Sequence, residues 1–443
     1  MAASVAHLSA LAQKIQEKTK VVSDYLTSHG LQAPSWDVDG LQEFPIPESA
    51  GEAFEARVEL LQATKELYDL TLGPKQGLQW LSWDLVADPD PNTQFMNNLS
   101  LQAVWELRVA SFVPVNGDIS FDSLTQKVRE ANGFHIGVMN LRRLIRHAML
   151  NHLFHEPRKG YVAHTSTSLL LRDNEPMANW VGYMCRDLWY PATQVLDAMK
   201  KWPGSEESTE TAVNLAFNQS LGWYDFLQAN PEKAHRYNMA MKAHGDGEGF
   251  SIDQTVTGYP WDSRLGSTAT VVDMGGNQGF VSFALADAFP QMRFIVQDLP
   301  GMRTPEAMGP LPAHLEGRVT RTVHDFFEPQ TEVADAYLLR WIIHGFADKY
   351  CVKLLRALVP ALRPGARVII NDGTLPEPGT ANYIQERDIR TMDCFNQVTV
   401  NSREREIDDW AQLFAEADSR FRFCGAWKPP HSAMWFIEAE WVD

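Results

Sequence analysis

Seven apolar runs of strand length follow Ser267, and they constrain the fold of this chain more than any other feature. They are TATVVD, RFIVQD, RVTRTVHD, AYLLRW, ARVIIND, RFRFCGAW and AMWFIEAEW. Helical patterns separate the first six, and strands that alternate with helices predict a parallel sheet with helices on both faces. The segment KPPHS joins the last two runs, which predict an antiparallel hairpin. We therefore predict an α/β fold in which residues 251–443 form a seven-stranded doubly wound domain.

The N-terminal half of the chain has a mostly helical pattern. Residues 1–95 predict a helical extension, and residues 96–175 run helix, turn, helix, turn, helix and a short β-wing, which is the pattern of a winged helix. Residues 176–250 predict a helical linker that is rich in Trp, Tyr and Met. The third winged-helix helix carries Arg142, Arg143, Arg146 and His147. Such a helix can bind DNA, but it can also serve packing and dimerisation.

The charge of the chain favours a role in packing and dimerisation over DNA binding. Asp and Glu number 56 against 39 Lys and Arg, for a formal net charge of −17. Nucleic-acid backbones and anionic membranes select clustered cations, so we expect neither as a partner. Four cysteines are scattered without a CxxC pair, so we expect neither a disulfide framework nor a bound metal. The first residues lack signal-peptide order and no apolar run approaches a membrane span of ~20 residues, so we expect a cytoplasmic protein.

A glycine-rich loop, VVDMGGNQGF, follows the first strand of the predicted sheet. Its pattern is D-x-G-x-x-x-G, whereas dinucleotide-binding folds carry G-x-G-x-x-G. The Lys-Ser/Thr pair of a triphosphate-binding loop is missing. Asp273 lies inside the end of the strand, where a carboxylate could face a cationic amino group. Asp298 follows Gly279 by 19 residues at the end of the second strand, where a carboxylate can bind ribose hydroxyls.

Ionisable residues also stand at the ends of the next strands. A single Asp there is often only a helix cap or a turn residue. Ligands in open α/β sheets, however, bind outside the carboxyl ends of the strands, so five such positions in series predict one binding crevice. They are Asp273 with the glycines, Asp298, Asp325 followed by Phe326 and Phe327, Arg340 with His344, and Asp372.

The segments VVDMGGNQG, QDLP, HDFFEP, YLLRWIIHGFADKYCVKLL and ARVIINDGTLPEPG occur in a specific order and spacing. In this respect the chain resembles class I S-adenosylmethionine-dependent methyltransferases. More narrowly, it is similar to small-molecule O-methyltransferases of the caffeate type, in the fungal secondary-metabolite branch. The resemblance covers about residues 95–443. It implies S-adenosylmethionine as cofactor, a Rossmann-like domain, and a winged-helix module that builds a homodimer.

The resemblance also implies roles for individual residues. Gly275 and Gly276 would lie against the methionine part of the cofactor, Asp298 would bind the ribose, and Asp325 and Phe326 would flank the adenine. Arg340 takes the place of a family lysine that touches the cofactor. His344 matches the catalytic base, and Asp372 and Glu404 match two acids that orient it. Glu404 has a structural alternative, because it opens the helical pattern REIDDWAQLFAEA, where an acid suits the helix dipole.

Two departures from the family pattern stand near these residues. His344-Gly345-Phe346 replaces the usual His-Asp-Trp, and Asn277 stands where glycine is common. Both bear on how tightly the cofactor is held, and neither removes the base. A phenol has a pKa near ~10 and is protonated at neutral pH, whereas a neutral histidine can accept its proton.

The expected acceptor is a flat, apolar aromatic small molecule. Met and aromatic side chains can wall such a pocket, although residues of this kind are more often plain core. The candidates are Phe217, Trp223, Tyr237, Met239, Met241, Met392 and Phe395. Two other functions stay open: a cofactor-binding pericyclase or cyclase of the same fold, which transfers no methyl group, and a non-catalytic scaffold or regulator.

Overall fold

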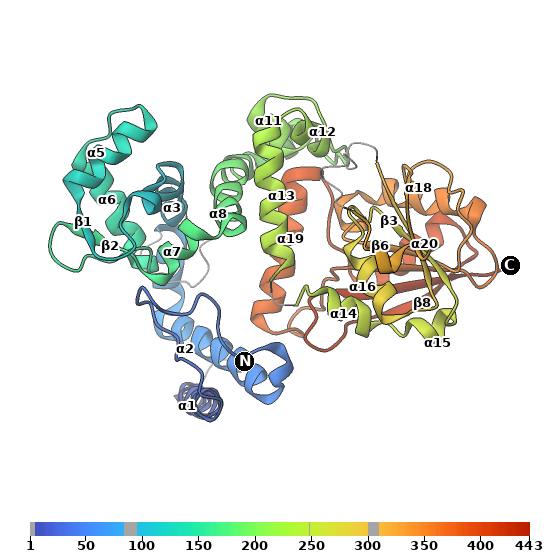
Figure 1. The fold of residues 1–443 in the computed structure, drawn as a ribbon, viewed down its shortest axis with the longest axis horizontal. Coiled ribbons are helices and arrows are strands. Elements are labelled where there is room, and N and C mark those ends of the chain that lie inside the picture. Colours follow the sequence, from blue (N-terminus) through green and yellow to red (C-terminus); the bar gives the residue numbers. More distant parts are fainter. Residues whose placement is uncertain (1–4, 84–94, 248, 300–309) are drawn as a thin grey trace. The chain divides into compact units, whose positions relative to one another are not determined.

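The computed structural model describes residues 5–83, 95–247, 249–299 and 310–443. These residues divide into two compact units (Figure 1). The first unit comprises Met1–Tyr190 and Leu227–His244, and the second comprises Pro191–Phe226 and Gly245–Asp443. The helical segment that the sequence predicts over residues 176–250 is therefore shared between the two units.

The first unit is mostly helical. Its α1 and α2 pack together around Val22, Leu26 and Phe54. A two-stranded antiparallel sheet joins β1 (Asp118–Ser120) to β2 (Tyr161–Ala163). Its helices are α1 (Val5–Ser28), α2 (Glu52–Trp83), α3 (Phe95–Glu106), α4 (Val109–Phe112), α5 (Phe121–Asn132), α6 (Val138–Ala148), α7 (Ser166–Asp173), α8 (Glu175–Gly182), the π-helical η3 (Tyr183–Leu188) and α13 (Pro231–Gly245), with α9 (Trp189–Ala192) at the boundary.

The elements β1, α5, α6 and β2 follow one another in the chain, and β1 pairs with β2. The hydroxyl of Ser120 caps α5 by accepting the N–H of Ser123, and Gly133 ends the helix with a φ of 69°. On α6, Arg146 makes a bidentate ion pair with Glu156, with both hydrogen bonds at 2.8 Å. That hydrogen bonding lowers the pKa of Glu156 to about 2. The charge of Arg146 is thus used within the chain, in agreement with a packing role for this helix.

The second unit is built on a seven-stranded sheet in the order β5-β4-β3-β6-β7-β9-β8. The first five strands of that order are parallel, and β9 pairs antiparallel with both β7 and β8. The strands are β3 (Thr270–Met274), β4 (Arg293–Asp298), β5 (Val319–Val323), β6 (Ala336–Arg340), β7 (Arg367–Asp372), β8 (Phe421–Trp427) and β9 (Trp435–Trp441). All seven predicted strands and the closing hairpin are confirmed.

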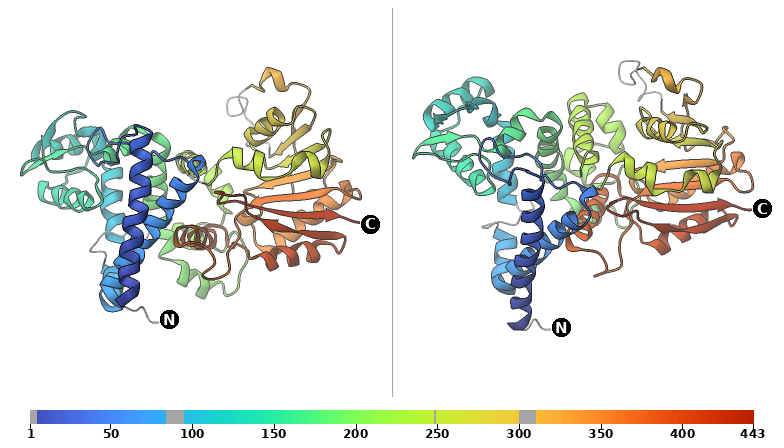
Figure 2. Two further views of the ribbon diagram at one scale, coloured as in Figure 1. Left: turned by 90° about the horizontal axis from the view of Figure 1, so that it is seen from below. Right: turned by 60° about the horizontal axis from the view of Figure 1, so that its bottom comes forward.

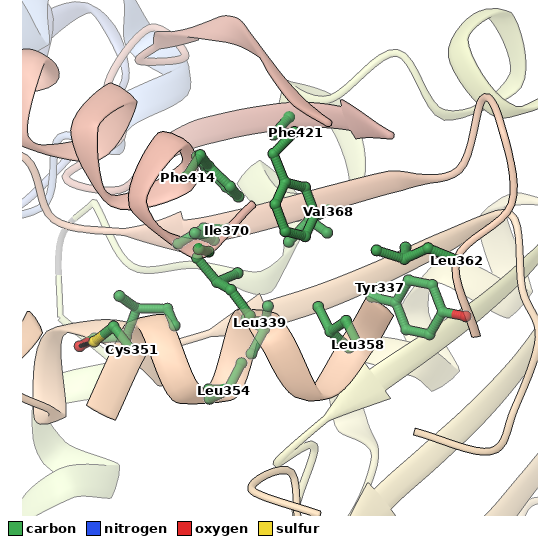
Figure 3. Close-up of a cluster of buried hydrophobic side chains, with 14 of the residues drawn as sticks. Tyr337, Leu339, Cys351, Leu354, Leu358, Leu362, Val368, Ile370, Phe414 and Phe421 are labelled. Atoms are coloured by element: carbon green, nitrogen blue, oxygen red, sulfur yellow. Dashed lines mark hydrogen bonds between the residues drawn. The ribbon is translucent and has the colours of Figure 1, made fainter. Parts of the chain in front are cut away.

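The sheet is buried on both faces because its strands alternate two sets of apolar side chains. Tyr337 and Leu339 of β6 pack with Val368 and Ile370 of β7 against α18 and α20 (Figure 3). The alternate residues, such as Leu338 and Ile369, pack on the opposite face with α15 and α16. Figure 2 shows these two helical layers. Such near-continuous apolar runs are typical of parallel strands covered on both sides.

The described helices of this unit are α10 (Val195–Lys201), α11 (Ala212–Phe217), α14 (Ile252–Gly258), α15 (Trp261–Leu265), α16 (Phe280–Ala288), α18 (Asp348–Leu358), α19 (Tyr383–Val400) and α20 (Ile407–Ala417), with α12 (Trp223–Gln228) at the boundary. The expectation of a helix between each of the first six strands is wrong for the connection from β5 to β6. Residues 324–335 contain no helix. Side-chain hydrogen bonds hold this connection in turns: Asp325 accepts the N–H of Phe327, and buried Gln330 pairs with Gln297.

Candidate active site

The site lies at the carboxyl ends of β3 and β6, the point where the strand order reverses direction. Gly275 follows β3 with a φ of 72°, and a Cβ atom there would lie 2.5 Å from Cδ1 of Ile342. A Cβ on Gly276 would lie 2.6 Å from the carboxyl carbon of Asp273. Neither position has room for a Cβ atom, so only glycine allows the close contacts of this loop with Ile342 and Asp273. The same contact brings the loop against Ile342, two residues before His344.

Asp298 ends β4 and supports the same loop. Its Oδ2 accepts the N–H of Asn277 at 2.8 Å, and its Oδ1 accepts the N–H of Leu299 at 2.7 Å. Each carboxylate oxygen keeps a second lone pair for an outside donor. Phe326 lies on the other side, where its ring is 3.7 Å from the position of a Cβ on Gly275. Asp325 lies two residues beyond the end of β5, so strand three ends earlier than the sequence predicts.

Asp273 lies against this loop, and Arg340 ends the neighbouring strand β6. Asp273 is buried, and its Oδ2 accepts a 2.6 Å hydrogen bond from the Ser282 hydroxyl. Burial raises the pKa of Asp273 to about 6. The guanidinium of Arg340 donates through Nε to Thr255 and Asn371, and through Nη2 to the carbonyl of Phe250. Burial lowers the pKa of Arg340, although the nearby carboxylates of Asp372 and Asp273 act to raise it.

His344 lies in the short helix η6 (Ile343–Gly345), and its side chain is 14% exposed. Its Nδ1 lies 3.1 Å from Oε1 of Glu404, a residue 60 positions away that is buried completely. The helix start predicted for Glu404 is wrong, because α20 begins at Ile407 after the cap residue Glu406. Glu404 lies before the helix and contacts the histidine. The ring of Trp341, which has a φ of 58°, lies 5.0 Å from the ring of His344.

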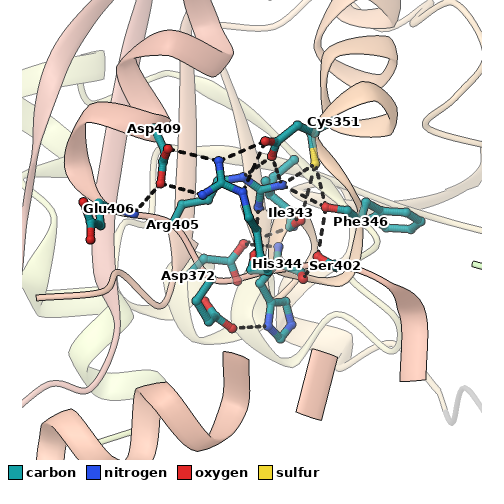
Figure 4. A network of polar contacts seen from close by, with 12 residues as sticks. Ile343, His344, Phe346, Cys351, Asp372, Ser402, Arg405, Glu406 and Asp409 are labelled. Atoms are coloured by element: carbon teal, nitrogen blue, oxygen red, sulfur yellow. Dashed lines mark hydrogen bonds and ion pairs between the residues drawn. The ribbon is translucent and has the colours of Figure 1, made fainter. Parts of the chain in front are cut away.

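Asp372 ends β7 and contacts the backbone of the same turn (Figure 4). Its Oδ2 accepts the backbone N–H groups of Ile343 and His344, at 3.0 and 3.3 Å. Burial raises the pKa of Asp372 to about 6. Burial alone would lower the pKa of His344, but Asp372 and Glu404 outweigh it and raise that pKa above its ordinary value. Two buried carboxylates thus favour a positive charge on the ring.

Two residues that the sequence did not single out hold the turn in place. Ser402 donates its hydroxyl to the carbonyls of His344 and Phe346. Arg405, which is fully buried, donates to the carbonyls of Ile343 and Phe346 and to Oδ1 of Asp348, the last at 2.6 Å (Figure 4). The neighbouring charges in RERE were the only sequence signal for Arg405, and charge runs usually lie on solvated surfaces.

The predicted pocket residues fall on several elements. Met392 and Phe395 are half-buried on α19, and α11 with Phe217 packs against that helix. Trp223 is 3% exposed and packs on Phe226, 6.1 Å between ring centroids, which is the environment of a core residue. Tyr237, Met239 and Met241 belong to α13, in the first unit.

Comparisons with known proteins show the family to which the chain belongs. The O-methyltransferase domain matches residues 205–420. The O-methyltransferase of the grayanic acid biosynthesis cluster from Cladonia grayi is 36% identical over 439 residues, which cover 99% of this chain and 88% of the relative. The chain belongs to the O-methyltransferase family. A chlorophenol O-methyltransferase from Trichoderma longibrachiatum is 35% identical and covers 98% of this chain and 90% of its own length.

A solved structure shares the fold of this O-methyltransferase. OxaC in complex with S-adenosylhomocysteine and oxaline has a TM-score of 0.70 at 22% identity, with 98% of this chain and 99% of that chain covered. These comparisons identify the chain as an S-adenosylmethionine-dependent enzyme of fungal secondary metabolism.

The geometry of the glycine loop fits this cofactor. Gly275 and Gly276 form a surface that a Cβ would fill, and the carboxylate of Asp298 has lone pairs to spare beside it. Among the residues that the structure describes, no group of His, Cys, Asp and Glu could hold a metal ion. None of the described helices is long and apolar enough to cross a membrane.

Proposed function

We propose that His344 is the general base of this O-methyltransferase and removes the proton from a phenolic hydroxyl of a small secondary metabolite. The contact between His344 and Glu404 carries this proposal. A carboxylate can only accept, so Nδ1 must bear the proton of this bond. In the neutral ring the other nitrogen, Nε2, is then unprotonated and can take a proton from the acceptor.

The cofactor supplies an electrophilic methyl group, and the chain holds it and prepares the acceptor. Gly275 and Gly276 would receive its methionine part, Asp298 its ribose, and Asp325 and Phe326 its adenine. Asp273 would support the loop, and Arg340, which takes the place of the family lysine, would touch the cofactor. As His344 takes the proton, Glu404 and Asp372 stabilise the imidazolium. Alignment of the hydroxyl with the methyl group would supply much of the rate, about 7–11 kcal/mol in well-oriented systems.

The proposed acceptor is a flat aromatic molecule with a free hydroxyl. The relative named for chlorophenol supports a phenol. Met392 and Phe395 on α19, with Phe217 on α11, offer apolar and aromatic surface for it.

The test is the initial rate against pH for the wild type, His344→Ala and His344→Gln. General bases contribute typically 10²–10⁴-fold, so both variants should lose about that much at neutral pH while the affinity for S-adenosylhomocysteine stays nearly intact. The deficit should shrink as pH rises toward the pKa of the phenol, because an ionised phenol needs no base. A deficit that stays constant up to that pH would show that His344 does not remove the acceptor proton.

Cofactor with a labelled methyl group and a phenol library would separate the remaining readings. Label in the product supports methyl transfer. Turnover without label would point to a pericyclase or cyclase that uses only the charge of the cofactor. Cofactor binding without any turnover would point to a scaffold.

We also propose that the enzyme is a cytoplasmic homodimer assembled through its N-terminal half. The support is the dense apolar pattern before residue 200, which exceeds what a small winged-helix module can bury. Exposed Phe134, Met139 and Leu150 near and on α6 agree with a covered surface there.

A further inference from the structure

The last part of α19 carries a buried amide, Asn396, that faces the catalytic histidine. The residue is 2% exposed. A buried amide is costly unless it is hydrogen-bonded. Asn396 donates from Nδ2 to Oε1 of Glu404 at 2.9 Å, and the same nitrogen lies 3.5 Å from Nδ1 of His344. The amide thus points away from its own helix and toward the acid behind the histidine.

Oε1 of Glu404 therefore accepts from two N–H groups, one of Asn396 and one of His344. These two hydrogen bonds fix the direction in which this carboxylate oxygen points. The amide nitrogen can only donate, so it cannot accept the hydrogen bond of the Nδ1 proton, which His344 donates to Glu404 instead. The backbone of Glu404 is also held, because its N–H donates to Oδ1 of Asp393 at 2.7 Å.

We propose that Asn396 is a positioning residue of this reaction, which keeps Glu404 oriented and His344 in the tautomer whose Nε2 is free. This inference rests on the proposed role of His344 as base. Asn396 acts through Glu404 and need not touch the acceptor.

Several charges face the histidine, and a pH test must consider them all. Asp372 stands at the end of β7, and Glu404 and Arg405 stand in the segment after α19. Arg405 is paired with Asp348 at the start of α18. Arg340 at the end of β6 lies in the field of Asp372. From α19 itself come Asn396, which is neutral, and Asp393. A carboxylate in place of Asn396 would add one negative charge on the side of Nδ1.

Two variants of opposite kind test the proposal. Asn396→Leu keeps the shape but removes the donor, and it should lower kcat roughly tenfold at neutral pH, the effect of one hydrogen bond to a charged group. KM for S-adenosylmethionine should stay unchanged, and kcat should recover as pH rises toward the pKa of the phenol, because an ionised phenol needs no base. Asn396→Asp adds a charge beside Nδ1, which stabilises the imidazolium. The acid limb of its kcat profile should move up by about one pH unit, with recovery at high pH.

Thr399→Val is the matched control. Thr399 is also buried on α19, and its hydroxyl bonds only within the helix, to the carbonyl of Phe395 at 2.9 Å. This variant should unfold at a temperature similar to that of Asn396→Leu and keep the wild-type pH profile. Wild-type kcat in Asn396→Leu, or an unmoved acid limb in Asn396→Asp, would overturn the proposal. Equal losses at every pH in all three variants would show a structural role and also overturn it. If His344→Ala, measured in parallel, keeps full activity, it is the proposed function that fails.

Discussion

Replacing Gly275 by alanine should separate backbone strain from steric exclusion at the cofactor loop. With a φ of 72°, an alanine there pays the left-handed penalty of about 1–2 kcal/mol. Its Cβ would also lie 2.5 Å from Cδ1 of Ile342. Carbon atoms pack at about 3.5–4.0 Å, so Ile342 or the loop must move by roughly 1 Å. We expect the affinity for S-adenosylhomocysteine to fall at least tenfold, which is about 1.4 kcal/mol.

Gly317→Ala is the control, because Gly317 has a φ of 79° and nothing within 4 Å of its Cβ position. Both variants should lose stability through strain, by about 2–8 °C in Tm for a unit of this size. Only Gly275→Ala should lose affinity in a calorimetric titration with S-adenosylhomocysteine. If Gly275→Ala binds like the wild type, or if Gly317→Ala loses as much affinity, the steric argument is refuted.

Three further predictions concern other parts of the molecule. Asp298→Ala should weaken S-adenosylhomocysteine binding by about 1.5–3 kcal/mol, the value of a hydrogen bond to a charged acceptor; an unchanged calorimetric affinity would remove Asp298 from the cofactor site. The pKa of Asp372 is about 6 in the folded chain and ~3.9 in the unfolded chain. Protonation of Asp372 therefore contributes stability that is fully present below pH ~4 and is lost as pH rises through about 6. Asp372→Asn should therefore raise Tm at pH 7 relative to the wild type and not at pH 4, while activity falls; equal Tm differences at both pH values would contradict this. Deleting residues 1–100 should cause aggregation in light scattering, whereas a fully active monomer would contradict the homodimer.

The strands were predictable because parallel strands that are buried on both faces leave a strong local signal. β4 and β7 begin and end within one residue of the predicted runs. The glycine loop was equally readable, since glycine is needed wherever a Cβ would collide. The connection from β5 to β6 was not readable, because its conformation depends on the pairing of Gln330 with Gln297, 33 positions away.

The contacts of Ser402 and Arg405, on either side of the predicted Glu404, show why part of the support of the histidine escaped prediction. The charges of this segment precede a helix and suggest a helical start, but residues 402–405 have no regular secondary structure. Ser402 and Glu404 reach the backbone and ring of His344, and Arg403 reaches Asp348. Arg405 reaches both Asp348 and the carbonyls of Ile343 and Phe346. These partners lie 55 to 62 positions earlier in the chain, so tertiary contacts with η6 and α18, and no local pattern, decide where the side chains of this segment lie.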